Sequence, residues 1–316
     1  MDTILLTELL YCNGKAIMKN ATGYICAVLS AMVWGLLVFG GKILALAGLS
    51  LVEIMVIPNA IVALALSFVA WKHRSELTRI PVAIYALYVL VSIGGNLGTF
   101  AGLFMGVSVS IVLFCLYTLP VWNILLSKIV LKSKISKTEI CVTVLIILGL
   151  LLLLAPWREA TYSFWGIAIS LLGGFCIALW VLVTSHLSKL GVVPITQTFI
   201  QNLLACTPII LAYPLFVKMF PDPTISAVTM HPLTVCVGIV AFSLSVMILA
   251  PMLFYKATQS VKPLHLGLIL LLDPVVGVTL DITFLDTILT WNIAIGGLLI
   301  ISVNAWLVLK RGRNVA

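Results

Sequence analysis

The sequence predicts an all-α membrane protein with ten transmembrane helices, arranged as two inverted five-helix repeats. Three observations support this fold class. The 316 residues are 62% hydrophobic and only 9% charged, whereas a soluble protein carries roughly a quarter charged residues. The apolar residues form ten runs, most of them near the roughly 20 residues that a spanning helix needs. One of these segments also occurs twice in the chain.

The ten runs are joined by short connections that leave no room for a soluble domain. Residues 22–156 hold the first five runs and residues 163–310 the other five, between a cytoplasmic N-terminal segment, 1–21, and a cytoplasmic tail, 311–316. The expected helices occupy residues 23–47, 50–71, 80–106, 109–130, 138–156, 163–187, 194–217, 232–257, 261–284 and 287–309.

The duplicated segment covers residues 107–131 and, 154 positions later, residues 261–285. Each copy is an apolar run with a proline near its middle, Pro120 in the first and Pro274 in the second. A proline there removes a backbone hydrogen bond and bends the helix. In lipid, the freed carbonyl is tolerated only where protein or a water-filled cavity covers it. Two bent helices, one in each half, therefore predict a central site.

The basic residues predict the orientation. All of the 18 lysines and arginines except Lys42, Arg158 and Lys218 fall on one side if both termini lie in the cytoplasm, as the positive-inside rule requires. Each half holds an odd number of spans, so the second half enters the membrane from the opposite side, and the repeat is inverted. The same basic residues lie in short loops between apolar runs, so the net charge of +8 does not indicate nucleic-acid binding.

Asp273 and His265 are the ionisable side chains expected deepest in the ninth span. An intramembrane carboxylate is costly and usually faces an interior pathway. Asp273 is thus a candidate to bind a cationic substrate or carry a proton, or else to cap the helix broken at Pro274. His265 precedes it by eight residues, about 80° around a helix, and could border the same cavity as a proton relay or form a local hydrogen bond.

Other candidates for a substrate site are aromatic or polar. Trp34 and Trp180 occupy related places in the two repeats, and Phe100 matches Phe254 at the 154-residue offset. Ligand cavities are commonly aromatic with a few polar groups, although helix packing explains single aromatic residues equally well. The predicted substrate-binding set is Trp34, Asn96, Phe100, Tyr117, Trp180, Ser245 and Asp273.

Several kinds of chemistry have no motif here. The chain has no nucleotide-binding loop with the Gly-x-x-x-x-Gly-Lys-Ser/Thr pattern. It has no His/Cys cluster with metal-ligand spacing and no Ser/His/Asp order that would indicate hydrolysis. We therefore expect no enzyme activity, no cofactor and no metal.

Short motifs in both halves resemble the drug/metabolite transporter superfamily, EamA type. They are Ala31 to Gly35, Leu119-Pro120-Val121 with Leu131-Lys132-Ser133, and in the second half Leu272 to Val275 with Leu285-Asp286. The resemblance, which rests on the order and spacing of these motifs, covers residues 22–310. The chain departs from the family where Lys132 and Ser133 replace a common Gly-Glu, and where Pro58-Asn59 replaces a common arginine. Asn96 and Ser245 lie in the third and eighth spans, which line the cavity in that family.

The resemblance implies a secondary transporter of the cytoplasmic membrane, working by alternating access on a small polar or amphipathic metabolite. Amino acids or their derivatives, moved outward, are the expected cargo. The alternative is uptake or exchange of a nucleoside-containing metabolite such as S-adenosylmethionine, since tryptophans can stack on adenine. An intramembrane enzyme and a structural subunit of a membrane complex are the rivals from other classes. The expected partners are the substrate, the lipid bilayer and, in a proton-coupled carrier, the proton; the protein is a monomer or a homodimer.

Overall fold

The structure, a computed structural model of the chain, describes residues 21–105, 107, 109–130, 132, 135–158, 163–211, 213–214, 232–284 and 289–313. These residues are almost entirely helical and contain no strand, so the all-α prediction is confirmed. Six described helices are long and apolar enough to cross a membrane, and three more are apolar but shorter. The arrangement as ten spans stays a prediction.

The first half begins with a helix at Ala21–Trp34. The helices that follow are α2 (Leu36–Leu46), α3 (Leu51–Lys72), α4 (Arg74–Leu77), α5 (Val82–Phe104), α6 (Val109–Leu116), α7 (Leu119–Ile129) and α8 (Lys137–Leu154). Two starts are set by the same local device. The hydroxyls of Ser50 and Ser136 each accept a hydrogen bond from the backbone N–H of the glutamate three residues later. The carboxylate of that glutamate accepts in turn from the backbone N–H of the serine. This capping box satisfies donors that a helix start would leave unpaired.

The second half has the same order of long helices. After a short 3-10 turn, Pro156–Arg158, come α9 (Phe164–Lys189), α10 (Pro194–Leu211), α12 (Pro232–Phe242), the π-helical η2 (Ser243–Leu249), α13 (Ala250–Ala257), α14 (Pro263–Ile269), the 3-10 turn η3 (Leu270–Leu272), α15 (Asp273–Phe284) and α16 (Trp291–Arg313).

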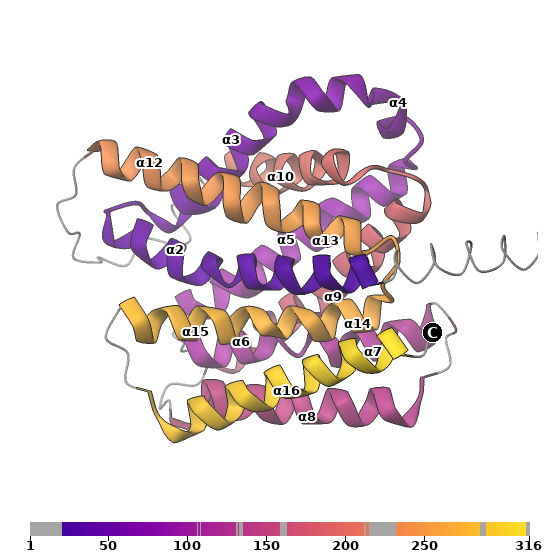
Figure 1. The fold of residues 1–316 in the computed structure, drawn as a ribbon. Coiled ribbons are helices and arrows are strands. Elements are labelled where there is room, and N and C mark those ends of the chain that lie inside the picture. The colour runs from indigo at the N-terminus through magenta and orange to yellow at the C-terminus, as the bar shows by residue number, and fades with distance from the viewer. Residues whose placement is uncertain are drawn as a thin grey trace, which may run out of the picture.

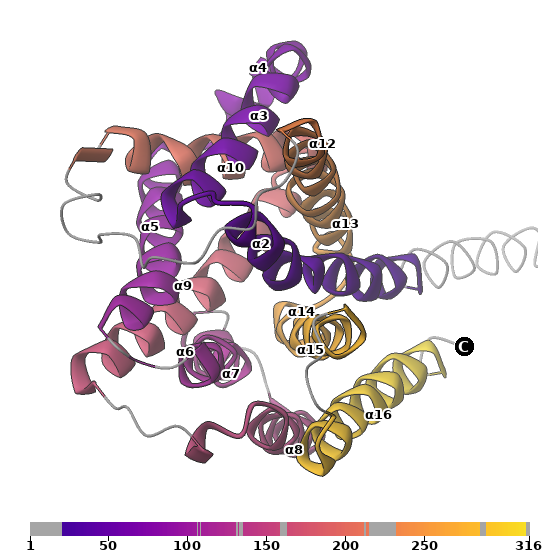
Figure 2. The same cartoon turned by 90° about the vertical axis from the view of Figure 1, so that its left-hand side faces the viewer.

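Helices at matching places in the two halves pack on each other. The packed pairs are α3 with α10, α7 with α14, and α8 with α16. Figures 1 and 2 show α8 beside α16 at one edge of the bundle and α3 beside α10 at the opposite edge. At the α8–α16 contact, a Cβ added to Gly149 would lie 3.1 Å from the carbonyl oxygen of Gly296. Gly149 of α8 and Gly296 of α16 thus let these two helices approach closely.

Helix α14 lies in the interior of the bundle. Every residue from Leu264 to Leu271 is buried, whereas Thr279 and Thr283 of α15 are exposed. Large apolar side chains such as Leu64, Phe68 and Leu298 lie exposed on the outer faces. Such an apolar exterior suits a protein whose surroundings are lipid chains.

Candidate functional site

The first copy of the duplicated segment is broken at Tyr117. Helix α6 ends at Leu116, α7 begins at Leu119, and Tyr117 and Thr118 form the turn between them. Pro120 has no N–H, so the carbonyl of Leu116 loses its usual donor. The Thr118 hydroxyl donates to the carbonyl of Cys115 at 2.6 Å and covers part of the opened backbone. The helix is thus interrupted beside the proline, as the sequence predicts, and the bend itself stays a prediction.

The second copy is broken at Asp273. Helix α14 gives way to the 3-10 turn Leu270–Leu272, and α15 then begins at Asp273 with Pro274 behind it. As in the first copy, the proline cannot supply the donor that the carbonyl four residues earlier would use. Both halves therefore contain a helix interrupted at its proline, as the sequence predicts.

The two breaks meet. Tyr117 donates from its hydroxyl to the Oδ2 of Asp273 at 2.7 Å, across 156 residues of sequence. Asp273 is only 9% exposed, and its other carboxylate oxygen, Oδ1, has no hydrogen-bond partner among the described residues. A buried carboxylate oxygen is costly without a donor or a cation. Oδ1 is therefore an atom of the site that needs a hydrogen-bond donor or a cation.

Three aromatic rings from three helices form a cluster beside this contact. The ring centroids of Trp34 and Trp180 lie 5.9 Å apart in an edge-on arrangement. Phe254 of α13 stacks on Trp180 at 4.9 Å with an interplanar angle of 11°, and lies 5.3 Å from Trp34. Phe254 is fully buried, whereas both tryptophans are partly exposed. The structure thus brings together the two tryptophans that the repeat relates.

A chain of hydrogen bonds anchors the cluster on one side. The indole nitrogen of Trp180 donates to the Tyr88 hydroxyl at 2.9 Å, and the Tyr88 hydroxyl lies 3.0 Å from that of Tyr255. Tyr255 in turn donates to the side-chain oxygen of Gln201. Both tyrosines are buried. This chain links α5, α9, α10 and α13 and holds Trp180 in one orientation.

The aromatic cluster and Asp273 are joined through Gly35. A Cβ added to Gly35 would lie 3.0 Å from the backbone oxygen of Asp273, closer than nearly all real Cβ contacts. Only a residue without a side chain lets the first helix approach the break this closely. Leu272, directly before Asp273, packs in the same apolar cluster as Trp34, Trp180 and Phe254, so this cluster borders the break at Asp273.

The predicted residues of the eighth span lie in a distorted helix. The π-helical turn Ser243–Leu249 precedes Pro251, whose missing N–H frees the carbonyl of Met247. Asn202 of α10 donates to that carbonyl at 3.1 Å. The Ser245 hydroxyl donates to the Ala241 carbonyl of its own helix at 2.7 Å. Within the described residues Ser245 thus serves its own backbone, and the structure does not bring it to the aromatic cluster.

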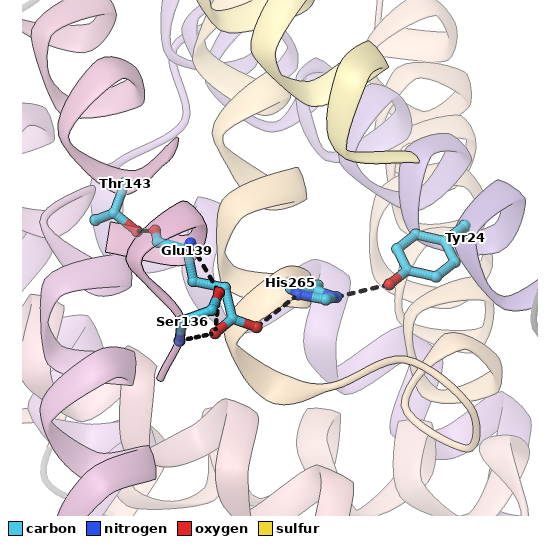
Figure 3. A network of polar contacts seen from close by, with 5 residues as sticks. All are labelled: Tyr24, Ser136, Glu139, Thr143 and His265. Atoms are coloured by element: carbon cyan, nitrogen blue, oxygen red, sulfur yellow. Dashed lines mark hydrogen bonds and ion pairs between the residues drawn. The ribbon is translucent and has the colours of Figure 1, made fainter. Parts of the chain in front are cut away.

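Two further predicted site residues, Asn96 and Phe100, belong to α5, but their side chains lie outside the described part of the structure. His265 is described and lies elsewhere. Figure 3 shows its ring between Tyr24 and Glu139, at the start of α14. The 80° relation to Asp273 assumes one continuous α-helix, and the 3-10 turn Leu270–Leu272 breaks that continuity.

A groove of about 480 Å³ opens elsewhere, between α8 and α16. Its lining residues are Thr138, Cys141, Val142, Leu145, Ser302, Val303 and Trp306. It does not include any residue of the aromatic cluster or of the Tyr117–Asp273 contact. We do not assign the substrate site to it.

The sequence reasoning missed several residues of this region. Tyr88, Gln201 and Phe254 were not selected as site residues, and neither Tyr24 nor Glu139 was connected with His265. The usable signal was a polar group within an apolar run, such as Tyr88 in the third span, since a buried tyrosine hydroxyl usually finds a partner. Nothing in one sequence pairs Tyr88 with Trp180, 92 residues away.

The EamA-like transporter family matches the chain twice, over residues 21–155 and 164–309. No curated protein sequence matches. One solved structure, titled only "Crystal structure of protein", aligns with a TM-score of 0.73 over 92% of this chain and 98% of that chain, at 13% identity. That likeness concerns the fold alone. The double match confirms the internal repeat, and the chain belongs to the EamA-like transporter family.

Proposed function

We propose that this membrane protein is a secondary transporter for a small metabolite that combines a cationic group with an apolar or aromatic part. An amino acid or a derivative that has lost its carboxylate charge fits this description best. The observation that carries the proposal is the buried Asp273 carboxylate at the meeting point of two broken helices, beside an aromatic cluster.

The carboxylate favours a cationic group. Its Oδ2 accepts from Tyr117, while Oδ1 lacks a described partner. A substrate ammonium group supplies both the positive charge and the N–H donors that such an oxygen needs. Binding of the cation at Asp273 therefore offsets the cost of burying an oxygen that has no described partner.

The rings favour an apolar or aromatic portion next to the charge. Trp34, Trp180 and Phe254 offer flat surfaces, and a cation over a tryptophan face gains further attraction. An S-adenosylmethionine-like metabolite also combines a cation with a ring that can stack on tryptophan. It is the second candidate, and it differs in having a sulfonium, which is a cation without N–H donors.

The mechanism that we propose is alternating access by two inverted repeats of five spans, with both termini in the cytoplasm. It is supported by the packing of matching helices on each other and by one broken helix in each half, which is the usual design around a central site. The proposed direction, export across the cytoplasmic membrane, rests on the family resemblance alone.

Flux into proteoliposomes tests this function. The purified protein is reconstituted, and counterflow of labelled amino acids, decarboxylated amines and S-adenosylmethionine is measured beside protein-free liposomes. Transport predicts movement of at least one of these compounds unchanged. Chemical conversion of the compound would support an intramembrane enzyme, and absence of both flux and conversion for all three classes would refute a carrier of cationic metabolites.

A further inference from the structure

The groove between α8 and α16 lies on the outer face of the bundle, apart from the aromatic cluster and Asp273. Val142 and Val303, which line it, are buried and belong to the apolar cluster between the two helices. Leu145 and Trp306 also line it and are exposed. The groove is therefore open to whatever surrounds the protein, and its base is apolar.

The groove forms because α8 and α16 touch closely toward one end only. A Cβ added to Gly296 would lie 2.5 Å from the backbone oxygen of Gly149, and Asn292 donates to the carbonyl of Leu152 at 3.1 Å. The groove lies away from these contacts, toward the start of α8 and the end of α16. Figure 1 shows the two helices separating in that direction. The side chains of the two helices leave this widening space unfilled.

The surface around the groove favours an apolar occupant. Leu148, Leu298 and Ile301 of the same two helices are exposed, and in a membrane such faces contact lipid chains. A chain that lies in a groove between two helices has protein atoms on several sides, whereas a chain on a convex face has them on one. Dispersion attraction grows with the number of such contacts. The groove therefore suits the acyl chain of a lipid.

Basic residues at the open end of the groove favour a negatively charged headgroup. Lys137, the first residue of α8, is exposed and directly precedes Thr138, which lines the groove. On α16, Lys310 follows Trp306 by four positions, which is about one helical turn along the same face. The sequence of α16 contains no acidic residue, and Glu139, the acidic residue of α8, is buried. Lysines near a membrane surface attract anionic lipids.

A second copy of the chain fits this face less well than a lipid. Two copies in one membrane have the same orientation, so a two-fold pairing across the groove would place the basic ends of α8 and α16 against the same ends of the other copy. Like charges facing each other in an interface oppose association. An anionic lipid has the opposite charge and the apolar chain that the groove needs.

We propose that this groove binds an anionic phospholipid from the leaflet on the predicted cytoplasmic side, with one acyl chain between α8 and α16 and its phosphate at Lys137. Helix α8 belongs to the first repeat and α16 to the second, so the bound lipid contacts both halves of the protein. This inference goes beyond the proposed transport function and does not depend on it.

Two cysteines of the chain measure occupancy of the groove. Cys141 lines the groove and is exposed, and Cys236 of α12 is exposed outside it. The purified full chain, freed of lipid in detergent, is treated with N-ethylmaleimide while phosphatidylglycerol or phosphatidylcholine with the same acyl chains is added. Mass spectrometry gives the alkylation rate at each cysteine. Phosphatidylglycerol is expected to slow the reaction at Cys141 but not at Cys236, and phosphatidylcholine to need about a fivefold higher concentration for the same effect.

Three variants assign the binding to the groove and its charge. Lys137→Gln is expected to lower the affinity for phosphatidylglycerol about fivefold, the effect of one lysine near the headgroups, and to leave phosphatidylcholine unaffected. Lys256→Gln is the matched control, because Lys256 is an exposed lysine at the end of α13 on the same predicted side. Ser302→Phe places a ring in the groove from an exposed position. It is expected to remove one bound phosphatidylglycerol in native mass spectrometry.

Equal protection of Cys141 by the two lipids would overturn the proposal, and this comparison needs no variant. Equal effects of Lys137→Gln and Lys256→Gln would show general attraction to the basic side and would also overturn it. Protection by glycerol 3-phosphate as strong as that by the lipid would assign the site to a free phosphate compound. A two-chain species that disappears in folded Ser302→Phe would assign the groove to a second copy, against the proposal.

Discussion

Replacing Asp273 by asparagine separates the charge of this residue from its shape. Asparagine has the same size, and its side-chain oxygen can still accept from the Tyr117 hydroxyl, which lies 2.7 Å from the carboxylate. The change therefore leaves the meeting of the two broken helices in place. It removes the negative charge at the second oxygen, which has no partner among the described residues.

The expected loss of affinity follows from that one interaction. A hydrogen bond to a charged group contributes about 1.5–3 kcal/mol, and each 1.4 kcal/mol changes a dissociation constant about tenfold. Asp273→Asn should therefore weaken binding of an amine substrate roughly 10- to 150-fold. The N-acetylated form of the same substrate lacks the cation, so its weaker binding should change little.

Quenching of tryptophan fluorescence by the two compounds measures both affinities, because Trp34 and Trp180 belong to the apolar cluster that borders the break at Asp273. Glu53→Gln serves as the matched control, since Glu53 is an exposed residue that caps α3 and glutamine preserves its capping box. Equal weakening of the amine and its acetylated form would refute a charge interaction. Unchanged binding and counterflow in Asp273→Asn would show that Asp273 only caps the broken helix and does not bind the substrate.

The remaining predictions concern the rings, one buried amide and the topology. Trp34→Ala and Trp180→Ala should each weaken substrate binding without loss of expression, measured by binding of labelled substrate; wild-type affinity in both would return the rings to a packing role. Asn202→Leu should lower the free energy of unfolding by about 1–3 kcal/mol, because a buried carbonyl loses its donor, with thermal unfolding in detergent as the measurement. Reporters fused after Arg158 and after Ala316 should report opposite sides of the membrane, and the same side for both would exclude the ten-span arrangement.

The broken helices could be predicted because their cause is local. A proline inside an apolar run frees a carbonyl whatever surrounds it. Helices α3 and α10 nevertheless continue through Pro58 and Pro208, so it was the repetition of the segment, together with its proline, that singled out Pro120 and Pro274. The partner of the break could not be predicted in this way. Tyr117 and Asp273 meet across 156 residues, and that distance depends on how the two halves pack rather than on either segment alone.

The intramembrane amides and hydroxyls show the same limit. Asn202 has a role because Pro251, on another helix, leaves the Met247 carbonyl without a donor, and the two helices happen to bring them within 3.1 Å. Ser245 looks similar in sequence and bonds to its own helix instead. A polar residue in an apolar run therefore predicts that a partner exists, and the packed structure alone names the partner.

The two repeats differ in the ionisable residues that they carry at matching positions. At the offset of 154 residues, Asp273 corresponds to Leu119 and His265 to Ile111, both of which are buried apolar side chains. The pseudo-symmetric positions of the first repeat thus carry no charge. A cation bound at Asp273 would lie off the axis that relates the halves, closer to the second repeat.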